Sequence, residues 1–499
     1  MVWLVVNGDP KETHDGRADM TNFEMDLFDT RMTEIKVEKE EKATYCCGYR
    51  ASRNRIIKPA CVPISIISLF IIALVFLPLF NEEDLSSPFK LPTECPNSCS
   101  SSLVESIPTG LQLPPPHYNS TSDAWISLVD GARKYIDISV MYWNLNTSDY
   151  STAIYGRRFY EALIRAGRRG VKIRIAQDGS GSGLSDNAES KYLADQGLAE
   201  VRSINVSRLL GTGIIHTKFL IVDIENVYVG SANMDWKSLS EVKELGMVVE
   251  NCPCVAADLY RIFAIYWKLG EPDAKIPEHW PISYRTPYNF SHPSHVKLNG
   301  NLSEFFISSS PGPFNPKGRE HDLAAILQVI GSAKRSVCVS VMDYAPQTFY
   351  MKNNTFWPLI DDALRAAAFR GVAVRLLVSH WDHSRPSIIP FLRSLVAIND
   401  AMPKTSTGFG SINVKMFTVP ATPEQKKNPF TRVNHAKFMV TDDTAYVGTS
   451  NWSGDYFIST AGVALVVRQK AASRQLQEVF DRDWGSPYAA SLTASPLRF

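Results

Sequence analysis

The sequence predicts an α/β protein with two pseudo-symmetric lobes, each a mixed β-sheet flanked by helices, preceded by one transmembrane helix. A long duplicated segment, alternating helical and strand-like patterns, and one uncharged apolar run indicate this. The chain has 499 residues, 44% of them hydrophobic and 21% charged, which is typical of globular proteins. Because the formal net charge is only +1, binding to nucleic acid or another polyanion would have to be local.

The uncharged run covers residues 60–80, close to the ~20 residues that cross a bilayer core. Basic residues precede it and acidic residues follow it: Arg50, Arg53, Arg55 and Lys58, then Glu82, Glu83 and Asp84. This asymmetry predicts a type II membrane protein with a cytosolic tail at 1–59, a signal anchor at 60–80 and a lumenal stem at 81–100. A cleaved signal peptide is the alternative, but the preceding segment is too long for one.

Glycosylation sequons support a lumenal location for the rest of the chain, since all of them follow the anchor. We expect glycosylation at Asn119, Asn146, Asn205, Asn289, Asn301 and Asn353. A seventh sequon, at Asn451, lies inside a repeated motif, and we expect it to be unmodified.

Four cysteines form two close pairs, Cys95 with Cys99 and Cys252 with Cys254. In an oxidising compartment they suit two disulfides that tie the stem to the first lobe, with the connectivity left open. Zinc ligation is the weaker alternative, because these spacings are a poor zinc signature. Cys338 lies in an apolar strand pattern, which predicts a buried free thiol.

The duplicated region starts with residues 132–143, which match 333–344, and continues with 162–177, which match 363–379. Each copy is predicted as helix, strand, helix, strand and then a motif strand. Residues 162–169 form a helix that stops at Gly170, and the alternating pattern of the next seven residues indicates a strand. Repeats this long must each have a core, so we expect an N-terminal lobe at 101–290 and a C-terminal lobe at 291–499.

A polar motif recurs in both lobes at nearly the same offsets. Its first copy is His216, Lys218, Asp223, Gly230, Ser231 and Asn233, and its second is His435, Lys437, Asp442, Gly448, Thr449 and Asn451. Side chains alternate along a strand, so each His and Lys share a face. If the lobes pack about a pseudo-twofold axis, two imidazoles and two ammonium groups meet in one cleft.

Such a site suits a phosphodiester. The two lysines supply positive charge to the phosphate, and Ser231, Asn233, Thr449 and Asn451 can donate further hydrogen bonds. One histidine attacks phosphorus and the other protonates the leaving oxygen, a division of labour that the spacing does not assign. Asp223 and Asp442 are expected to orient the imidazoles, although Asp443 competes for the second position. No metal or cofactor is predicted.

The two motifs, together with the segments "VGSANMDWKSLSEVKELG" and "VNHAKFMVTDDTAYVGTSNWSGDYF", resemble the phospholipase D superfamily, and specifically its animal single-pass branch. The resemblance implies a lysosomal 5′→3′ exonuclease that acts on single-stranded DNA and RNA without a metal and releases nucleoside 3′-monophosphates. It also implies a homodimer, His216 as nucleophile, His435 as general acid, and a bracing role for Glu244, with Thr460 at the matching place of the second copy.

Two other functions remain open at this stage. One is phospholipase or transphosphatidylase activity on a lysophospholipid, which makes bis(monoacylglycero)phosphate and is also attributed to the branch. The other is an inactive membrane-tethered scaffold, which retention of both His–Lys pairs disfavours. Tyr142, Trp143, Trp236 and Trp452 near the motifs could stack nucleic-acid bases, but core packing explains each equally well.

Overall fold

The computed structural model describes Ile67, Ser68, Phe70 and residues 91–492, except residues 93, 94, 182, 184 and 407. The predicted tail at 1–59 and nearly all of the predicted anchor at 60–80 lie outside these residues. Among the helices that are described, none has the length and hydropathy needed to cross a membrane. The chain divides into two units, Met1–Ala73 and Leu74–Phe499, and both large sheets belong to the second unit.

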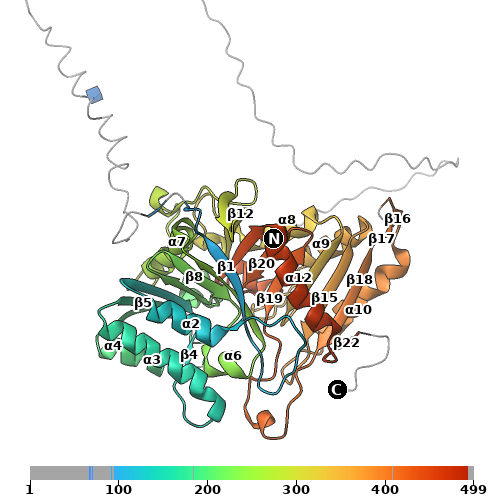
Figure 1. Cartoon of the computed structure of the whole chain (residues 1–499). Coiled ribbons are helices and arrows are strands. Elements are labelled where there is room, and N and C mark those ends of the chain that lie inside the picture. The colour runs from blue at the N-terminus through green and yellow to red at the C-terminus, as the bar shows by residue number, and fades with distance from the viewer. Residues whose placement is uncertain are drawn as a thin grey trace, which may run out of the picture. The chain divides into compact units, whose positions relative to one another are not determined.

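An eight-stranded mixed sheet forms the N-terminal lobe, shown in blue to green in Figure 1. Its strand order is β2 (Asn119–Ser120), β1 (Ser100–Ser106), β10 (Glu244–Glu250), β8 (Asn226–Gly230), β7 (Phe219–Val222), β3 (Tyr135–Val140), β5 (Lys172–Asp178) and β6 (Ala199–Ile204). The helices are α2 (Thr121–Asp130), α3 (Ile154–Arg168), α4 (Ala188–Asp195), α5 (Val206–Leu210), α6 (Trp236–Ser240) and α7 (Pro253–Leu269). A small separate pair joins β4 (Trp143–Asn144) to β9 (Met234–Asp235), and η1 (Ser151–Ala153) precedes α3.

A ten-stranded mixed sheet forms the C-terminal lobe, shown in yellow to red. Its order is β11 (Ser294–Leu298), β12 (Asn301–Ser310), β21 (Gly462–Arg468), β20 (Thr444–Gly448), β19 (Lys437–Thr441), β14 (Ser336–Val341), β15 (Ala373–Ser379), β18 (Ser411–Phe417) and β22 (Ala489–Ser491), with β13 (Glu320–His321) beside β12. The helices are α8 (Asp322–Ser332), α9 (Leu359–Phe369), α10 (Ile388–Ala397), α11 (Asp455–Ile458) and α12 (Lys470–Gly485). Short elements complete it: η2 (Ile282–Tyr284), η3 (Gly312–Phe314), η4 (Ile398–Ala401), η5 (Gln425–Lys427), and the pair β16 (Lys404–Thr405) and β17 (Gly408–Phe409).

The two sheets repeat one strand order. The series β1-β10-β8-β7-β3-β5-β6 corresponds to β12-β21-β20-β19-β14-β15-β18. The predicted mixed α/β fold with helices on the sheets is therefore confirmed. The second sheet adds β11 and β22 at its edges, which the sequence patterns did not indicate.

Hydrophobic side chains form a core on each face of the sheets. Phe219 and Ile221 of β7 face Phe438 and Val440 of β19 in a core between the lobes, to which α7 and α12 also contribute. The alternate residues of these strands pack beneath α2 and α3 in one lobe, and beneath α8, α9 and α10 in the other. Because side chains alternate along a strand, each central strand contributes to two cores.

Within the described residues, four buried ion pairs between a lysine or arginine and a carboxylate cross between the lobes. They join Lys243 to Asp483 at 2.6 Å, Glu105 to Arg482 at 2.7 Å, Glu241 to Arg432 at 3.2 Å, and Asp258 to Arg319 at 2.7 Å. A charge buried here has no water to stabilise it if its partner is removed, so the pairs tie the two lobes into one specific arrangement.

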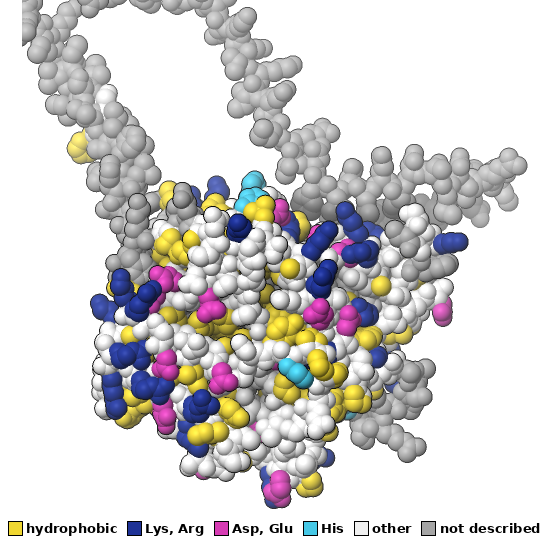
Figure 2. All heavy atoms as spheres, in the orientation of Figure 1, with side chains coloured by type: hydrophobic (Ala, Val, Ile, Leu, Met, Phe, Trp, Pro, Cys, Tyr) yellow, Lys and Arg dark blue, Asp and Glu magenta, His cyan; other side chains and the backbone are white. Residues whose placement is uncertain are grey.

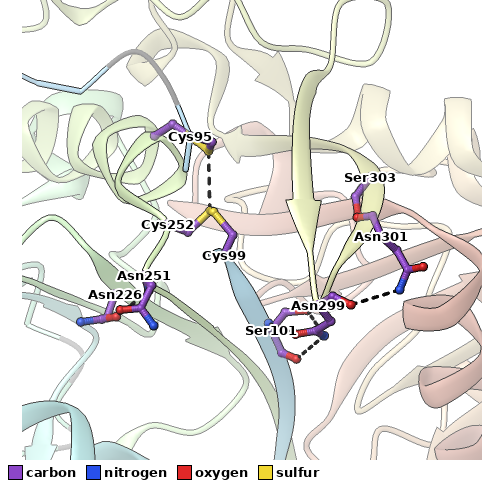
Figure 3. The surroundings of a disulfide bond; sticks show 10 residues. Cys95, Cys99, Ser101, Asn226, Asn251, Cys252, Asn299, Asn301 and Ser303 are labelled. Carbon is purple, nitrogen blue, oxygen red and sulfur yellow. Dashed lines mark hydrogen bonds between the residues drawn. A yellow bond between two sulfur atoms is a disulfide. The ribbon is translucent and has the colours of Figure 1, made fainter. Parts of the chain in front are cut away.

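The four predicted disulfide cysteines do form two disulfides, pairing Cys95 with Cys254 and Cys99 with Cys252. Figure 3 shows this cluster where the segment before β1 meets the start of α7. Beside it, the turn residue Asn299 accepts a hydrogen bond from the backbone N–H of Ser101 and donates to its carbonyl oxygen. The disulfides fasten the predicted stem segment to the N-terminal lobe, and the N–H of Asn299, which donates to the carbonyl of Cys99 at 3.0 Å, fastens it to the C-terminal lobe. Cys338 is a buried free thiol, as predicted.

The molecular surface carries both signs of charge. On the face shown in Figure 2, lysine and arginine side chains are interspersed with acidic ones. Five of the six predicted glycosylation sites are exposed, Asn289 is half-buried, and Asn451 is 1% exposed. The burial of Asn451 agrees with the expectation that it is unmodified.

Candidate active site

The two His–Lys pairs lie at equivalent positions of the two sheets. His216 and Lys218 immediately precede β7, while His435 precedes β19 and Lys437 begins it. All four side chains are buried: the histidines are 6% and 8% exposed and each lysine is 1% exposed.

Reciprocal backbone contacts between the lobes bring the pairs together. The N–H of His216 donates to the carbonyl of Ala461 at 2.9 Å, and the N–H of His435 donates to the carbonyl of Lys243 at 2.8 Å. Each histidine therefore contacts the residue that immediately precedes β21 or β10 in the opposite lobe. These contacts bring the two motifs together between the lobes, as predicted.

The lysine ammonium groups occupy matching positions. Nζ of Lys218 donates to the carbonyl of His216, and Nζ of Lys437 donates to that of His435, both at 2.6 Å. Burial lowers the pKa of Lys437 to about 7, although Glu244 opposes this. Burial, followed by the charge of Lys437, holds the pKa of Lys218 well below its usual value. Two closely placed cations in a buried site favour an anionic ligand.

His435 has a carboxylate partner from the other lobe. Its Nδ1 lies 2.9 Å from each carboxylate oxygen of Glu244. Burial lowers the pKa of His435 to about 4, while the charge of Glu244 acts in the opposite direction. Burial alone would raise the pKa of Glu244, but His435 and Lys437 outweigh it, so this pKa is lowered. The carboxylate therefore stays ionised and fixes the orientation of the imidazole.

His216 has a different environment. Its Nδ1 makes no hydrogen bond within the described part of the chain, and its ring packs edge-on against Tyr456 at 5.0 Å between centroids. Burial first, and then the charges of Lys218 and Lys437, hold the pKa of His216 well below 6.5. This environment favours the neutral imidazole, the state in which a ring nitrogen can act as a nucleophile.

The site is asymmetric at the position of Glu244. Leu245 and Val463 make equivalent hydrogen bonds to Ser231 and Thr449, which aligns Glu244 with Gly462 and not with Thr460 as expected. A Cβ at Gly462 would overlap with Oγ of Ser450 and lie 2.9 Å from Oγ of Ser310. No carboxylate fits there, so His216 lacks the partner that His435 has.

The predicted role of the aspartates is wrong. Asp223 accepts hydrogen bonds from the backbone N–H groups of residues 133–135 at 2.7–2.9 Å, and Asp442 accepts those of residues 334–336. Each aspartate follows its histidine by seven residues, and strand β7 or β19, which rises ~3.3 Å per residue, lies between them, so the two side chains are at opposite ends of the strand and too far apart for contact. Asp442, and not Asp443, is the counterpart of Asp223. Both aspartates hold the start of the neighbouring strand, β3 or β14.

The hydroxyls predicted to bind phosphate mainly hold strands together. Ser231 accepts from the N–H of Leu245 and donates to its carbonyl, which corrects its expected role. Thr449 accepts from the N–H of Val463. Asn451 donates to the hydroxyl of Tyr456 at 3.0 Å, while Oδ1 of Asn233 is enclosed without a partner in the described residues. Asn451 is therefore linked to His216 through Tyr456, whose ring packs against the imidazole.

Sequence reasoning missed Tyr456, because a tyrosine five residues beyond the motif carries no distinguishing signal. The aromatic residues that it did single out are mostly core: Trp143, Trp236 and Trp452 are buried. Tyr142 donates its hydroxyl to Asp235 at 2.8 Å. None of the three buried indoles is a surface for stacking bases.

Comparison with known proteins supports a single family. The model of the family described as PLD3/4, PLD-like domain matches residues 115–422. A probable phospholipase D of Caenorhabditis elegans, F09G2.8, is 64% identical, over 99% of this chain and 91% of that protein. The protein named 5′-3′ exonuclease PLD3 in Xenopus laevis is 46% identical, over 81% of this chain and 83% of that protein. Its namesake in Homo sapiens is 43% identical, over 84% of this chain and 86% of that protein.

Among solved structures, the phosphatidylserine synthase of Haemophilus influenzae Rd KW20 superposes with a TM-score of 0.50. It shares 11% sequence identity, and the match covers 74% of this chain and 85% of that one. This likeness concerns the fold alone.

Proposed function

Because the chain belongs to the PLD3/4 family of phospholipase D-like domains, we propose that it is a phosphodiesterase that degrades single-stranded DNA or RNA as a 5′→3′ exonuclease. The observation that carries the proposal is the meeting of two buried His–Lys pairs, only one of which has a carboxylate partner. Relatives named 5′-3′ exonucleases support the choice of substrate.

His216 attacks the phosphorus of the first phosphodiester from the 5′ end. Its neutral imidazole forms the N–P bond while the bond from phosphorus to the 5′-oxygen of the next nucleotide breaks. Lys218 and Lys437 stabilise the negative charge of the phosphoryl oxygens, which can replace the charge that a metal supplies elsewhere. The product of this step is a phosphohistidine that carries the first nucleoside through its 3′-oxygen.

His435 protonates the departing 5′-oxygen. Glu244 stabilises its imidazolium form, and the bound phosphodiester anion adds to that effect. Neutral His435 then accepts a proton from water, whose oxygen attacks phosphorus and releases a nucleoside 3′-monophosphate and free His216. The asymmetric placement of Glu244 supports this division of roles.

The arrangement in the cell is part of the proposal. Residues 1–59 are cytosolic, residues 60–80 anchor the chain, and the stem and both lobes lie in the endolysosomal lumen. The charge asymmetry around residues 60–80, the exposed sequons and the two disulfides support this topology. Homodimerisation and the phosphate-binding roles of Asn233 and Thr449 are further proposals on the same basis.

The test uses the purified full chain at pH 5 with EDTA and single-stranded oligonucleotides carrying a 5′-hydroxyl or a 5′-phosphate. We expect stepwise release of 3′-mononucleotides from the 5′-hydroxyl substrate, which His216→Ala abolishes. Rapid denaturation at alkaline pH, where the N–P bond survives, should trap ³²P on the wild-type protein but not on His216→Ala, and this would identify the phosphohistidine. Folded protein that cleaves no oligonucleotide would refute the nuclease proposal, and product from lysophosphatidylglycerol would then identify a lipid substrate.

A further inference from the structure

An exposed aromatic stack adjoins the second motif. His383 packs face to face with Phe430 at 4.6 Å between ring centroids, and edge-on against Trp381 at 4.8 Å. Phe430 is 51% exposed, an unusual position for a large apolar ring. The ring of His383 is thus held by stacking between Trp381 and Phe430.

The backbone presents Phe430 under strain. Phe430 and Arg432 both have positive φ, 60° and 57°, which side chains other than glycine rarely adopt. Arg432 holds the segment in place, because its guanidinium donates to the carbonyls of Pro420 and Thr109 and pairs with Glu241. Strain of this kind persists only where surrounding contacts impose it, and it is concentrated at functional sites.

A cavity of about 730 Å³ lies beside the stack. Its lining includes Trp381, His383 and Phe430 with Lys426 and Arg432, and one acid, Asp382. From the other lobe, Nζ of Lys237 lies 5.9 Å from the centre of the Phe430 ring. Aromatic rings with cations beside them are what an unpaired strand requires, since bases stack on the rings and phosphates approach the cations.

The two segments that form the stack are both connected to His435 through the chain. Phe430 precedes His435 by five residues, a span of at most ~16 to 18 Å in an extended chain. The hydroxyl of Ser379, at the end of β15, donates to the carbonyl of Asn434 next to His435. The loop that carries His383 begins directly after Ser379, so both sides of the stack connect to the motif.

We propose that Phe430, supported by His383, is the stacking surface for a base of the departing strand, downstream of the cleaved phosphodiester. This rests on the proposed function, in which His435 protonates the 5′-oxygen of that strand. The strand therefore leaves on the side of His435, where the stack lies. The first nucleotide, which stays on His216, does not contact Phe430.

The test compares two substrates with the full chain. One is a 5′-hydroxyl oligothymidylate, and the other is thymidine 3′-(p-nitrophenyl phosphate), which has no downstream base. Base–aromatic stacking contributes ~1–3 kcal/mol, so Phe430→Ala should raise KM for the oligonucleotide roughly 5- to 150-fold with kcat nearly unchanged. The p-nitrophenyl ester should be cleaved as by the wild type, and Phe430→Trp should restore the oligonucleotide KM.

A control variant and a modified substrate make the result specific. Phe369→Ala, which removes a 46% exposed ring at the end of α9, should change neither KM. A second set of substrates carries a single abasic position downstream of the scissile phosphate. For the wild type, one such position should raise KM, whereas the same position should not raise the KM of Phe430→Ala any further. Equal loss at every such position in both proteins would overturn the inference. So would an unchanged oligonucleotide KM in Phe430→Ala while the wild type digests normally, an outcome that leaves the proposed function intact. A wild type without nuclease activity would overturn both.

Discussion

Glu244 of the N-terminal lobe holds Nδ1 of His435 in the C-terminal lobe, with both carboxylate oxygens at 2.9 Å. The equivalent position facing His216 is Gly462, where hydroxyls of Ser450 and Ser310 occupy the space that a side chain would need. A duplicated site has thus acquired two chemically distinct histidines. Only the one with the carboxylate is suited to cycling through a protonated state.

Replacing Glu244 by Gln should impair catalysis more than binding. Loss of the carboxylate charge removes the interaction that opposes burial, so the pKa of His435 falls further below about 4 and less imidazolium is present at pH 5. We expect kcat to fall ~10²- to 10⁴-fold, the usual contribution of a general acid, and the optimum to move to lower pH. Glu250→Gln, at the other end of β10, is the matched control. A pH–rate profile identical to that of the wild type would refute this role.

Replacing Lys437 by Met should abolish activity and yet raise the melting temperature at pH 5. Burial lowers the pKa of Lys437 from 10.5 to about 7. The protonated side chain therefore destabilises the folded state relative to the unfolded chain. This loss of unfolding free energy is fully present below pH 7 and disappears as the pH rises above ~10.5. At ~1.4 kcal/mol per pKa unit, a third of the shift is ~1.6 kcal/mol, which raises the melting temperature of a protein of this size by ~2 °C. Calorimetry at pH 5 and pH 9 measures the difference in melting temperature between Lys437→Met and the wild type, and this difference should be smaller at pH 9.

The exposed Lys334 gives the matched control for that experiment, and Lys334→Met should leave the melting temperature unchanged at both pH values. A lower melting temperature for Lys437→Met at pH 5 would show that its hydrogen bond to the carbonyl of His435 matters more than the buried charge.

Replacing Asp442 by Asn should destabilise the protein without changing its chemistry. The carboxylate accepts three backbone N–H groups at the start of β14, and hydrogen bonds to a charged group contribute ~1.5–3 kcal/mol. We expect a lower melting temperature but a kcat within about threefold of the wild type per folded molecule. Asp443→Asn, at the exposed neighbouring position, should change neither quantity. A large loss of kcat in folded Asp442→Asn would restore the catalytic role first expected for this residue.

Replacing Arg319 by Met should lower the free energy of unfolding by at most roughly 3–5 kcal/mol, because the buried Asp258 then keeps, among the described residues, only its longer contact to Arg261, at 3.9 Å. Urea denaturation followed by tryptophan fluorescence measures the loss. The double variant Asp258→Leu with Arg319→Met should recover only part of that loss, because Arg261 then loses its contact to Asp258. If the double variant were as unstable as the single one, the ion pair itself would be the stabilising element.

Local sequence patterns predicted the repeated elements well. The repeat of the His216–Lys218 spacing at His435 and Lys437 predicted that the two pairs meet, on the condition that the lobes pack about a pseudo-twofold axis. The cysteine pairs predicted disulfides, although their connectivity required the fold.

Roles that depend on the other lobe could not be predicted in this way. An aspartate seven residues after a histidine appears close in sequence, but along an extended strand it lies at the opposite end, bound to the backbone of residues 334–336 or 133–135. The contact that matters, from Glu244 to His435, spans 191 residues and crosses the lobe interface.

The sequence by itself determined that this is a two-lobed α/β protein with two His–Lys pairs for phosphodiester chemistry, because periodicity and repeat spacing are local properties of the chain. The tertiary structure decided which histidine has a carboxylate, which aspartates only hold strands, and which aromatic ring is exposed beside the site. Those properties depend on burial and on contacts between distant segments, and packing alone establishes them.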